Sequence, residues 1–327
     1  NDEGIRYIFT LRSKTPFILD AKGEKMYGEG YQFAPGKDEV VREGTAGYVV
    51  AYGDLLYRAL DAVERARATG HAPAVAAPAR EDPADPDTLD RARRRHEAEL
   101  ALMRRRRWRC WIPDADPRLA RLGDDRPDLL FVAGAPEVRA PAVGVVGTRR
   151  PDAYGDAMAA SLAGALGRAG VVVVSGGAAG IDRRAHESAL DAGGATTIVL
   201  GGGLERPFPA PNRDLFARAV DAGSCVLSEW PPAFPARAFT FPRRNRLVAA
   251  LSDAVVVVQA GAVSGAVITA RRARDLGVPV FAIPGDTWYE RSAGTLALLA
   301  ARDVQPLGSV TDLASVPGLE ELARAPW

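Results

Sequence analysis

The chain has 327 residues, of which 47% are hydrophobic and 25% are charged, values ordinary for a globular protein with one large or two smaller domains. Its formal net charge is +1, so binding to nucleic acid would have to depend on local patches of charge. Two cysteines make no disulfide framework, and no apolar run approaches the roughly 20 residues of a membrane span. We find nothing like a secretion signal and expect a cytoplasmic protein without membrane contact.

The first part of the chain differs from the rest in its sequence pattern and composition. Residues 1–70 are typical of a partial α/β segment, because "AGYVVAYG" (46–53) indicates a strand and "DLLYRALDAVERARATG" (54–70) indicates an amphipathic helix. The stretch that follows is rich in Ala, Pro and Asp and has no apolar period. We therefore assign residues 71–97 to a linker.

From about residue 111 the pattern becomes regular, with short apolar runs that alternate with amphipathic helical stretches. The apolar runs span 142–147, 170–177, 195–203, 224–229, 253–260 and 279–285. Continuous β-branched runs of this kind indicate a parallel sheet that is covered by helices on both faces. We assign residues 98–310 to this doubly wound α/β domain and residues 311–327 to a short C-terminal tail.

Four loops next to these strands have compositions suited to binding an anion. They span 146–155, 175–182, 241–246 and 261–270. Their glycines allow backbone amides to approach an anion, and a following helix adds its positive end. In the third loop, Arg243, Arg244 and Arg246 crowd the start of a helix, where cations oppose the helix dipole unless an anion is bound. The alternative is that these arginines pair with surface carboxylates. The residues predicted to bind phosphate are Gly147, Arg149, Arg150, Ser175, Gly176, Gly177, Gly180, Arg183, Arg243, Arg244, Asn245, Arg246, Ser264 and Gly265.

Seven segments between about Trp111 and Leu307 resemble, in the same order, the DNA-processing protein A family (DprA, also called Smf). They are "VGTRRPDAYG", "SGGAAGIDRRAH", "VLGGGLERPFPAPN", "LSEWPP", "FPRRNRLVAALSDAVVVVQA", "SGAVITARRARDLGVPVFAIPG" and "SAGT". The resemblance implies an extended Rossmann-like domain that binds single-stranded DNA without cleaving it, with no catalytic residue, metal or cofactor. It further implies a homodimer that delivers the strand to the RecA recombinase in natural transformation.

Carried onto this sequence, the resemblance implies that Arg149, the Ser175–Gly177 loop and the arginines of "FPRRNR" contact DNA. Three positions depart from the family pattern, since Ala179 replaces a basic residue, Gln259 a glutamate and Leu296 an asparagine. These departures leave open whether every function of the family is retained or the chain is a diverged paralogue.

Residues 7–33 and 47–70 resemble the start of a transketolase C-terminal domain. The segment contains no thiamine-diphosphate motif, and the remaining strands of that domain are absent from the sequence. We interpret it as a fused remnant or an artefact of sequence assembly, with no carbohydrate chemistry.

Two other functions compete with strand binding. Related Rossmann-like families hydrolyse nucleoside monophosphates at the N-glycosidic bond with a "PGGxGT" loop and a catalytic glutamate, whereas the corresponding "GAVSGAVIT" here offers no carboxylate. The third hypothesis is a nucleotide-sensing module.

Trp108 and Trp111, which flank basic residues, could stack bases or pack at a core edge. His186 is predicted to be a packing residue.

Overall fold

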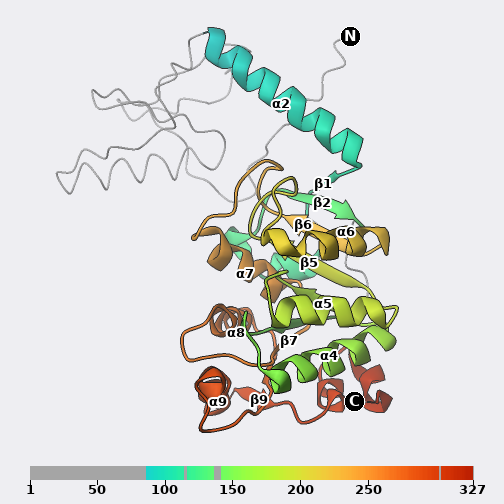
Figure 1. Cartoon of the computed structure of the whole chain (residues 1–327), viewed down its shortest axis with the longest axis vertical. Helices are drawn as coiled ribbons and strands as arrows, with labels where there is room; N and C mark the ends of the chain where they lie inside the picture. Colours follow the sequence, from blue (N-terminus) through green and yellow to red (C-terminus); the bar gives the residue numbers. More distant parts are fainter. Residues whose placement is uncertain (1–85, 114–115, 136–140, 302, 327) are drawn as a thin grey trace, which may run out of the picture. The chain divides into compact units, whose positions relative to one another are not determined.

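Figure 1 shows the computed structural model of the chain. The structure describes residues 86–113, 116–135, 141–301 and 303–326. Contacts divide the chain into one unit that ends at Ala98 and a second that spans Glu99–Trp327, and the fold below is that of the second unit. The strand and helix expected within residues 1–70, the linker up to residue 85 and the transketolase resemblance lie outside the described residues.

The domain is organised around one nine-stranded sheet (Figure 1). In chain order the strands are β1 (Arg109–Trp111), β2 (Leu130–Gly134), β3 (Ala142–Val146), β4 (Val172–Ser175), β5 (Thr196–Leu200), β6 (Cys225–Ser228), β7 (Ala254–Val257), β8 (Val280–Ala282) and β9 (Val304–Pro306). Their order across the sheet is β1-β2-β6-β5-β4-β3-β7-β8-β9. The seven strands from β6 across the sheet to β9 all pair in parallel. At the other edge, β2 pairs antiparallel with β6, and β1 pairs antiparallel with β2. The predicted mainly parallel, doubly wound Rossmann-like sheet is therefore confirmed, with its topological switch between β3 and β7.

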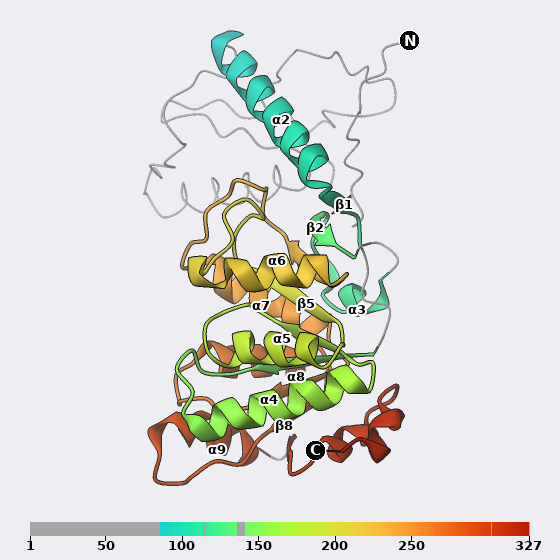
Figure 2. The same cartoon turned by 45° about the vertical axis from the view of Figure 1, so that its right-hand side comes forward.

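Helices cover both faces of the sheet. They are α3 (Pro117–Ala120), α4 (Ala153–Arg168), α5 (Ile181–Asp191), α6 (Arg213–Asp221), α7 (Thr240–Ala250), α8 (Gly265–Asp275) and α9 (Ala293–Leu299), with short 3₁₀ helices at Gly123–Asp125, Ala210–Asn212 and Glu290–Ser292. The helix α2 (Pro86–Arg106) spans the boundary between the two units. In Figure 2, α4, α5 and α6 lie side by side on one face. Neighbouring strand residues alternate between two cores, because Val143 and Val145 pack in one cluster and Ala142 and Val146 in the other. This alternation is why the strands read as unbroken apolar runs.

Residues beyond 310 complete one of these cores rather than trail from the domain. They form the 3₁₀ helices η4 (Val310–Ser315) and η5 (Glu320–Arg324). Leu313, Leu319 and Leu322 are fully buried in the cluster that also contains α4. The segment predicted as a short tail is therefore packed. Among the described residues, no helix has the length and apolarity to cross a bilayer.

Candidate nucleic-acid interface

The loops that follow β3 and β4 touch and form one surface at the carboxyl edge of the sheet. The Ile181 amide donates to the Thr148 carbonyl oxygen over 3.1 Å. A side chain on Gly147 would collide with Ile181, and one on Gly180, whose φ is +78°, would collide with the Arg149 backbone. These glycines are therefore required by the close approach of the two loops.

This surface offers open hydrogen-bond donors. Arg149 and Arg150 are exposed at the end of β3. The backbone amides of Arg149, Ala179 and Gly180 donate to no described residue. Ala179 and Gly180 immediately precede α5, so their amides lie close to the positive end of the helix dipole. The combination is suited to holding a phosphate.

Other amides of the β4 loop are occupied by the chain's own carboxylate. Asp182 Oδ2 accepts hydrogen bonds from the amides of Gly176 (3.2 Å) and Ala178 (3.3 Å). Burial raises the pKa of Asp182, and the charge of Arg244 opposes that rise. The sequence interpretation gave the Gly176 amide to a phosphate. In the structure this amide donates to the chain's own carboxylate and is not available to a phosphate.

Arg244 supports this loop from beneath. Its guanidinium is buried and donates to the carbonyl oxygens of Gly176 and Val199, while Nε donates to Asn245 Oδ1 over 3.1 Å. Burial lowers the Arg244 pKa to about 10, although Asp182 pulls it upward. A side chain on Gly176 would fall on the guanidinium, which explains this glycine.

The other two arginines of α7 share one carboxylate. Arg246, with 5% of its side chain exposed, makes a bidentate pair with Glu229 over 2.6 and 2.9 Å. Arg243 lies 3.3 Å from the same carboxylate but leaves 43% of its side chain exposed. The alternative of carboxylate pairing therefore describes these two arginines, with a largely buried partner in place of a surface one.

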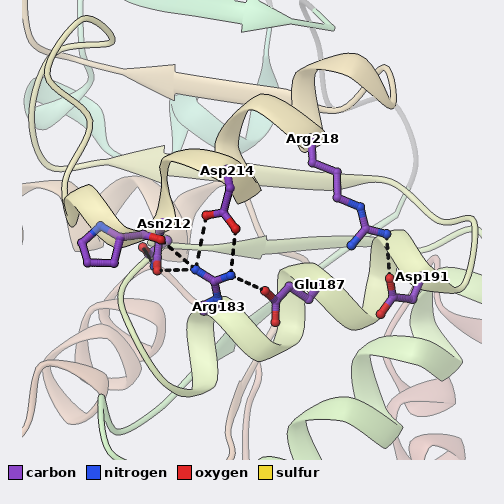
Figure 3. A network of polar contacts seen from close by, with 8 residues as sticks. Arg183, Glu187, Asp191, Asn212, Asp214 and Arg218 are labelled. Carbon is purple, nitrogen blue, oxygen red and sulfur yellow. Dashed lines mark hydrogen bonds and ion pairs between the residues drawn. The ribbon is translucent and has the colours of Figure 1, made fainter.

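Arg183 is held in a polar network that joins α5 to the start of α6 (Figure 3). Its guanidinium donates to Asn212 Oδ1 over 2.9 Å and pairs with Glu187 at 2.8 Å and Asp214 at 3.1 Å. Hydrogen bonding to Asp214 raises the Arg183 pKa. Two carboxylates balance its charge, and its ion pair with Asp214 holds α5 against the start of α6. The neighbouring Arg184 lies 3.2 Å from Asp156.

The polar side chains proposed from the remaining loops are also engaged internally. Ser175 is buried and donates to the Val145 carbonyl oxygen over 2.6 Å. Ser264 caps α8 by accepting the Val267 amide. Asn245 donates to the carbonyl oxygen of Gly265 over 3.3 Å and so ties α7 to that helix start. Gly177, with φ at +65°, packs against the core.

The structure adds a group of aromatic side chains that the sequence interpretation missed. The guanidinium of Arg149 lies 5.6 Å from the centre of the Phe241 ring, and the Phe208 ring is tilted against Phe241 with 5.6 Å between the ring centres. Phe208 is 47% exposed. A ring with an arginine beside it, at the edge that holds the open amides, is a surface on which a base can stack.

A second aromatic group lies in the segment between β6 and the start of α7. Trp230 stacks on Phe234 at 4.7 Å, meets the edge of the 60% exposed Phe239 and lies 6.0 Å from the Arg243 guanidinium. In the sequence, phenylalanines that alternate with arginines in "PAFPARAFTFPRR" were the available signal. Trp108 and Trp111, named from the sequence instead, are half-buried and pack against the cores.

The fold and this edge together define a Rossmann-like α/β domain that presents phosphate donors and stacking faces side by side. Residues 111–316 match the family of DNA recombination-mediator protein A, and the chain belongs to that family.

Several family members resemble the chain closely. A DprA protein of Mycobacterium tuberculosis (strain H37Rv) is 43% identical over 217 residues, covering 62% of this chain and 56% of the relative. DprA of Bacillus subtilis is 37% identical, covering 54% and 59%. The chain spans about half the length of the curated relatives it matches.

Two solved structures share the fold. DNA processing protein A from Streptococcus pneumoniae superposes with a TM-score of 0.60 at 31% identity, covering 72% of this chain and 81% of that one. DNA processing protein A from Helicobacter pylori, whose single-stranded DNA binding mode has been described, superposes with a TM-score of 0.57 at 30% identity, covering 64% and 94%.

Proposed function

We propose that this chain binds single-stranded DNA without regard to sequence, through backbone phosphates at Arg149 and the start of α5 and through base stacking on Phe241. The observation that carries the proposal is the position of the Arg149 guanidinium, 5.6 Å from the Phe241 ring, on a loop whose backbone meets Gly180 of the β4 loop. Phosphate donors beside a stacking face suit a strand whose bases are unpaired. The bases of a duplex are already stacked and cannot use the ring.

The carboxylates near the phosphate loops favour binding over catalysis. Hydrolysis of an N-glycosidic bond needs a carboxylate at the reacting carbon. Asp182 is buried against Arg244, and Glu229 is paired with Arg246 and Arg243. Neither carboxylate is open to a nucleotide held at the outer surface of the β4 loop, which favours binding over hydrolysis at that loop.

We further propose that the chain delivers the bound strand to the RecA recombinase, as a homodimer in the cytoplasm. This part rests on membership of a family of recombination mediators and on the H. pylori relative that binds single-stranded DNA. The departure at Ala179 removes a cation from the loop. Arg149 and Arg150 supply charge at the same edge.

The test is fluorescence anisotropy with a labelled (dT)20 strand and a mixed duplex over a series of salt concentrations. Arg149→Ala is expected to weaken strand binding and to reduce the log–log salt slope by about 0.7 for each phosphate that the variant no longer neutralises. Phe241→Leu is expected to lose about 1–3 kcal/mol, or 5- to 150-fold, with little change of slope.

The matched control is Arg168→Ala. Arg168 is exposed at the far end of α4, at the opposite edge of the sheet. If Arg149→Ala and Phe241→Leu both bind the strand as the control does, the proposed site is wrong.

A further inference from the structure

A cavity of about 540 Å³ opens beside the proposed strand site. It lies at the carboxyl ends of β3, β7 and β8, and its lining includes Asp152, Tyr154, Gln259, Asp286, Tyr289 and Ser292. This is the topological switch point of the sheet, where doubly wound folds bind ligands, and the volume is that of a small-molecule site.

Aromatic side chains from two elements flank the cavity. Tyr154, at the start of α4, is 48% exposed and donates its hydroxyl to the Pro284 carbonyl oxygen over 3.0 Å. Tyr289 comes from the loop after β8, and its neighbour Trp288 is 95% exposed. An exposed tryptophan beside a tyrosine-lined cavity is available to a flat, apolar ring.

The cavity lining includes two carboxylates, of which Asp286 has an oxygen open to a ligand. The Gly155 amide and the Gln259 side chain lower the pKa of Asp152 and keep it a carboxylate. Asp286 accepts the Trp288 amide through Oδ1 over 2.9 Å, and its Oδ2 bonds to no described residue. Carboxylates repel a phosphate but attract N–H groups, so the cavity suits an uncharged ring that carries donors.

Two arginines, Arg150 and Arg291, lie beside the cavity. Arg291 donates to the Arg150 carbonyl oxygen over 2.7 Å, and its guanidinium lies 5.6 Å from the centre of the Tyr289 ring. Both arginines are exposed. Arg291 therefore joins the cavity to the loop that carries Arg149, and a phosphate at the rim would be continuous with the proposed strand site.

We propose that this cavity is a nucleobase subsite that takes a base rich in N–H donors, guanine above all, with its phosphate at Arg150 and Arg291. Guanine presents N1–H and N2–H side by side to a carboxylate, whereas thymine presents two carbonyl oxygens around a single N–H. The inference rests on the proposed function where the base belongs to a bound strand. Since β3 and β8 are two strand spacings apart, about 10 Å, the next nucleotides of a strand held at Arg149 reach the cavity. A free guanine nucleotide has the same chemistry and is the other source.

The experiment compares two 12-nucleotide strands, one of thymine only and one with guanine at every third position, and the free nucleotides dGMP and dTMP. We expect the guanine-containing strand to bind about 5-fold more tightly or better. Asp286→Asn should abolish most of that preference for guanine over thymine. Asp221→Asn, an exposed carboxylate at the end of α6, is the matched control and should keep the preference.

Binding of free dGMP, measured by quenching of tryptophan fluorescence and lost in Asp286→Asn, would support the cavity with a free nucleotide as its occupant. A thermal melt of Asp286→Asn that matches the native protein shows that folding is intact. If neither the guanine strand nor dGMP is preferred, or if Asp286→Asn keeps the preference, the subsite is refuted. Loss of all strand binding in Arg149→Ala with dGMP binding intact would leave the subsite standing, whereas an unchanged affinity in that variant would count against the proposed function alone.

Discussion

The guanidinium of Arg244 lies under Gly176 and donates a hydrogen bond to the carbonyl oxygen of that glycine. Three arginines at the start of α7 oppose the helix dipole, and the sequence suggested a bound phosphate as the compensation. In the structure the compensation is internal, because Arg244 bonds to backbone carbonyls and both Arg243 and Arg246 pair with Glu229. Arg244 supports the β4 loop from below, whereas Arg149 is exposed at the end of β3.

Replacement of Arg244 by methionine is expected to destabilise the fold strongly. The change keeps much of the length of the side chain, but it leaves two buried carbonyl oxygens without their donor and removes the positive charge that offsets the buried Asp182. Breaking a buried charge pair costs about 3–5 kcal/mol in the free energy of unfolding, which urea denaturation measures. Arg243→Met, on the exposed neighbour, should cost no more than about 1 kcal/mol. Equal losses in the two variants would contradict the supporting role of Arg244.

Stability is expected to fall in mild acid because of His186. The side chain is fully buried, with Nδ1 2.5 Å from Thr196 Oγ1, and burial lowers its pKa from 6.5 to about 3. Between these values the unfolded chain binds a proton that the folded chain does not. Stability is therefore complete above pH 6.5 and is lost at about 1.4 kcal/mol per pH unit as the pH falls toward 3.

The raised pKa of Asp182 acts in the opposite sense, because acid favours its neutral form in the fold. A comparison of two proteins that both contain Asp182 removes this contribution. Between pH 7 and pH 5 the native protein should lose roughly 2 kcal/mol more than His186→Gln in urea denaturation. Parallel losses would show that His186 does not titrate in this window.

The hydrogen bonds of Gln259 explain why glutamine stands where the family pattern has glutamate. Its Nε2 donates to Asp152 Oδ2 over 2.9 Å, and its Oε1 accepts the Asp152 amide over 3.2 Å. A glutamate could not donate and would place a second carboxylate against the first. Gln259→Glu should lower the free energy of unfolding at pH 7 by about 1–3 kcal/mol, with recovery near pH 4 as one carboxylate is protonated. Gln305→Glu on the exposed part of β9 is the control, and an equal effect there would refute the explanation.

The sheet was predictable from the sequence because its central strands are buried on both faces and read as continuous apolar runs. The edge strands β1, β2 and β9 were not predicted. β1 and β9 have three residues each, and their pairing depends on neighbours distant in the chain.

The sequence could predict that the candidate site lies at the carboxyl edge of the sheet. It could not predict which groups the arginines there bind. Arg149 and the glycine loops were named from the sequence. Which arginine faces outward depends on Glu229 and on the carbonyl oxygen of Val199, 17 residues from Arg246 and 45 residues from Arg244. The stacking ring of Phe241 gains its meaning only from the approach of Arg149.

Arg183 and Arg149 should separate stability from binding. Arg183→Ala removes the pairs with Glu187 and Asp214, which are partly exposed, so we expect a loss of about 1 kcal/mol in the free energy of unfolding. Its strand affinity should stay within 2-fold of the native protein, since the network in Figure 3 leaves little of its charge for a phosphate. Arg149→Ala should show the reverse, with an unchanged thermal midpoint and weaker binding. If folded Arg183→Ala loses as much strand affinity as Arg149→Ala, Arg183 must leave its network to hold DNA, and the phosphate role predicted from its position in the sequence would be the correct one.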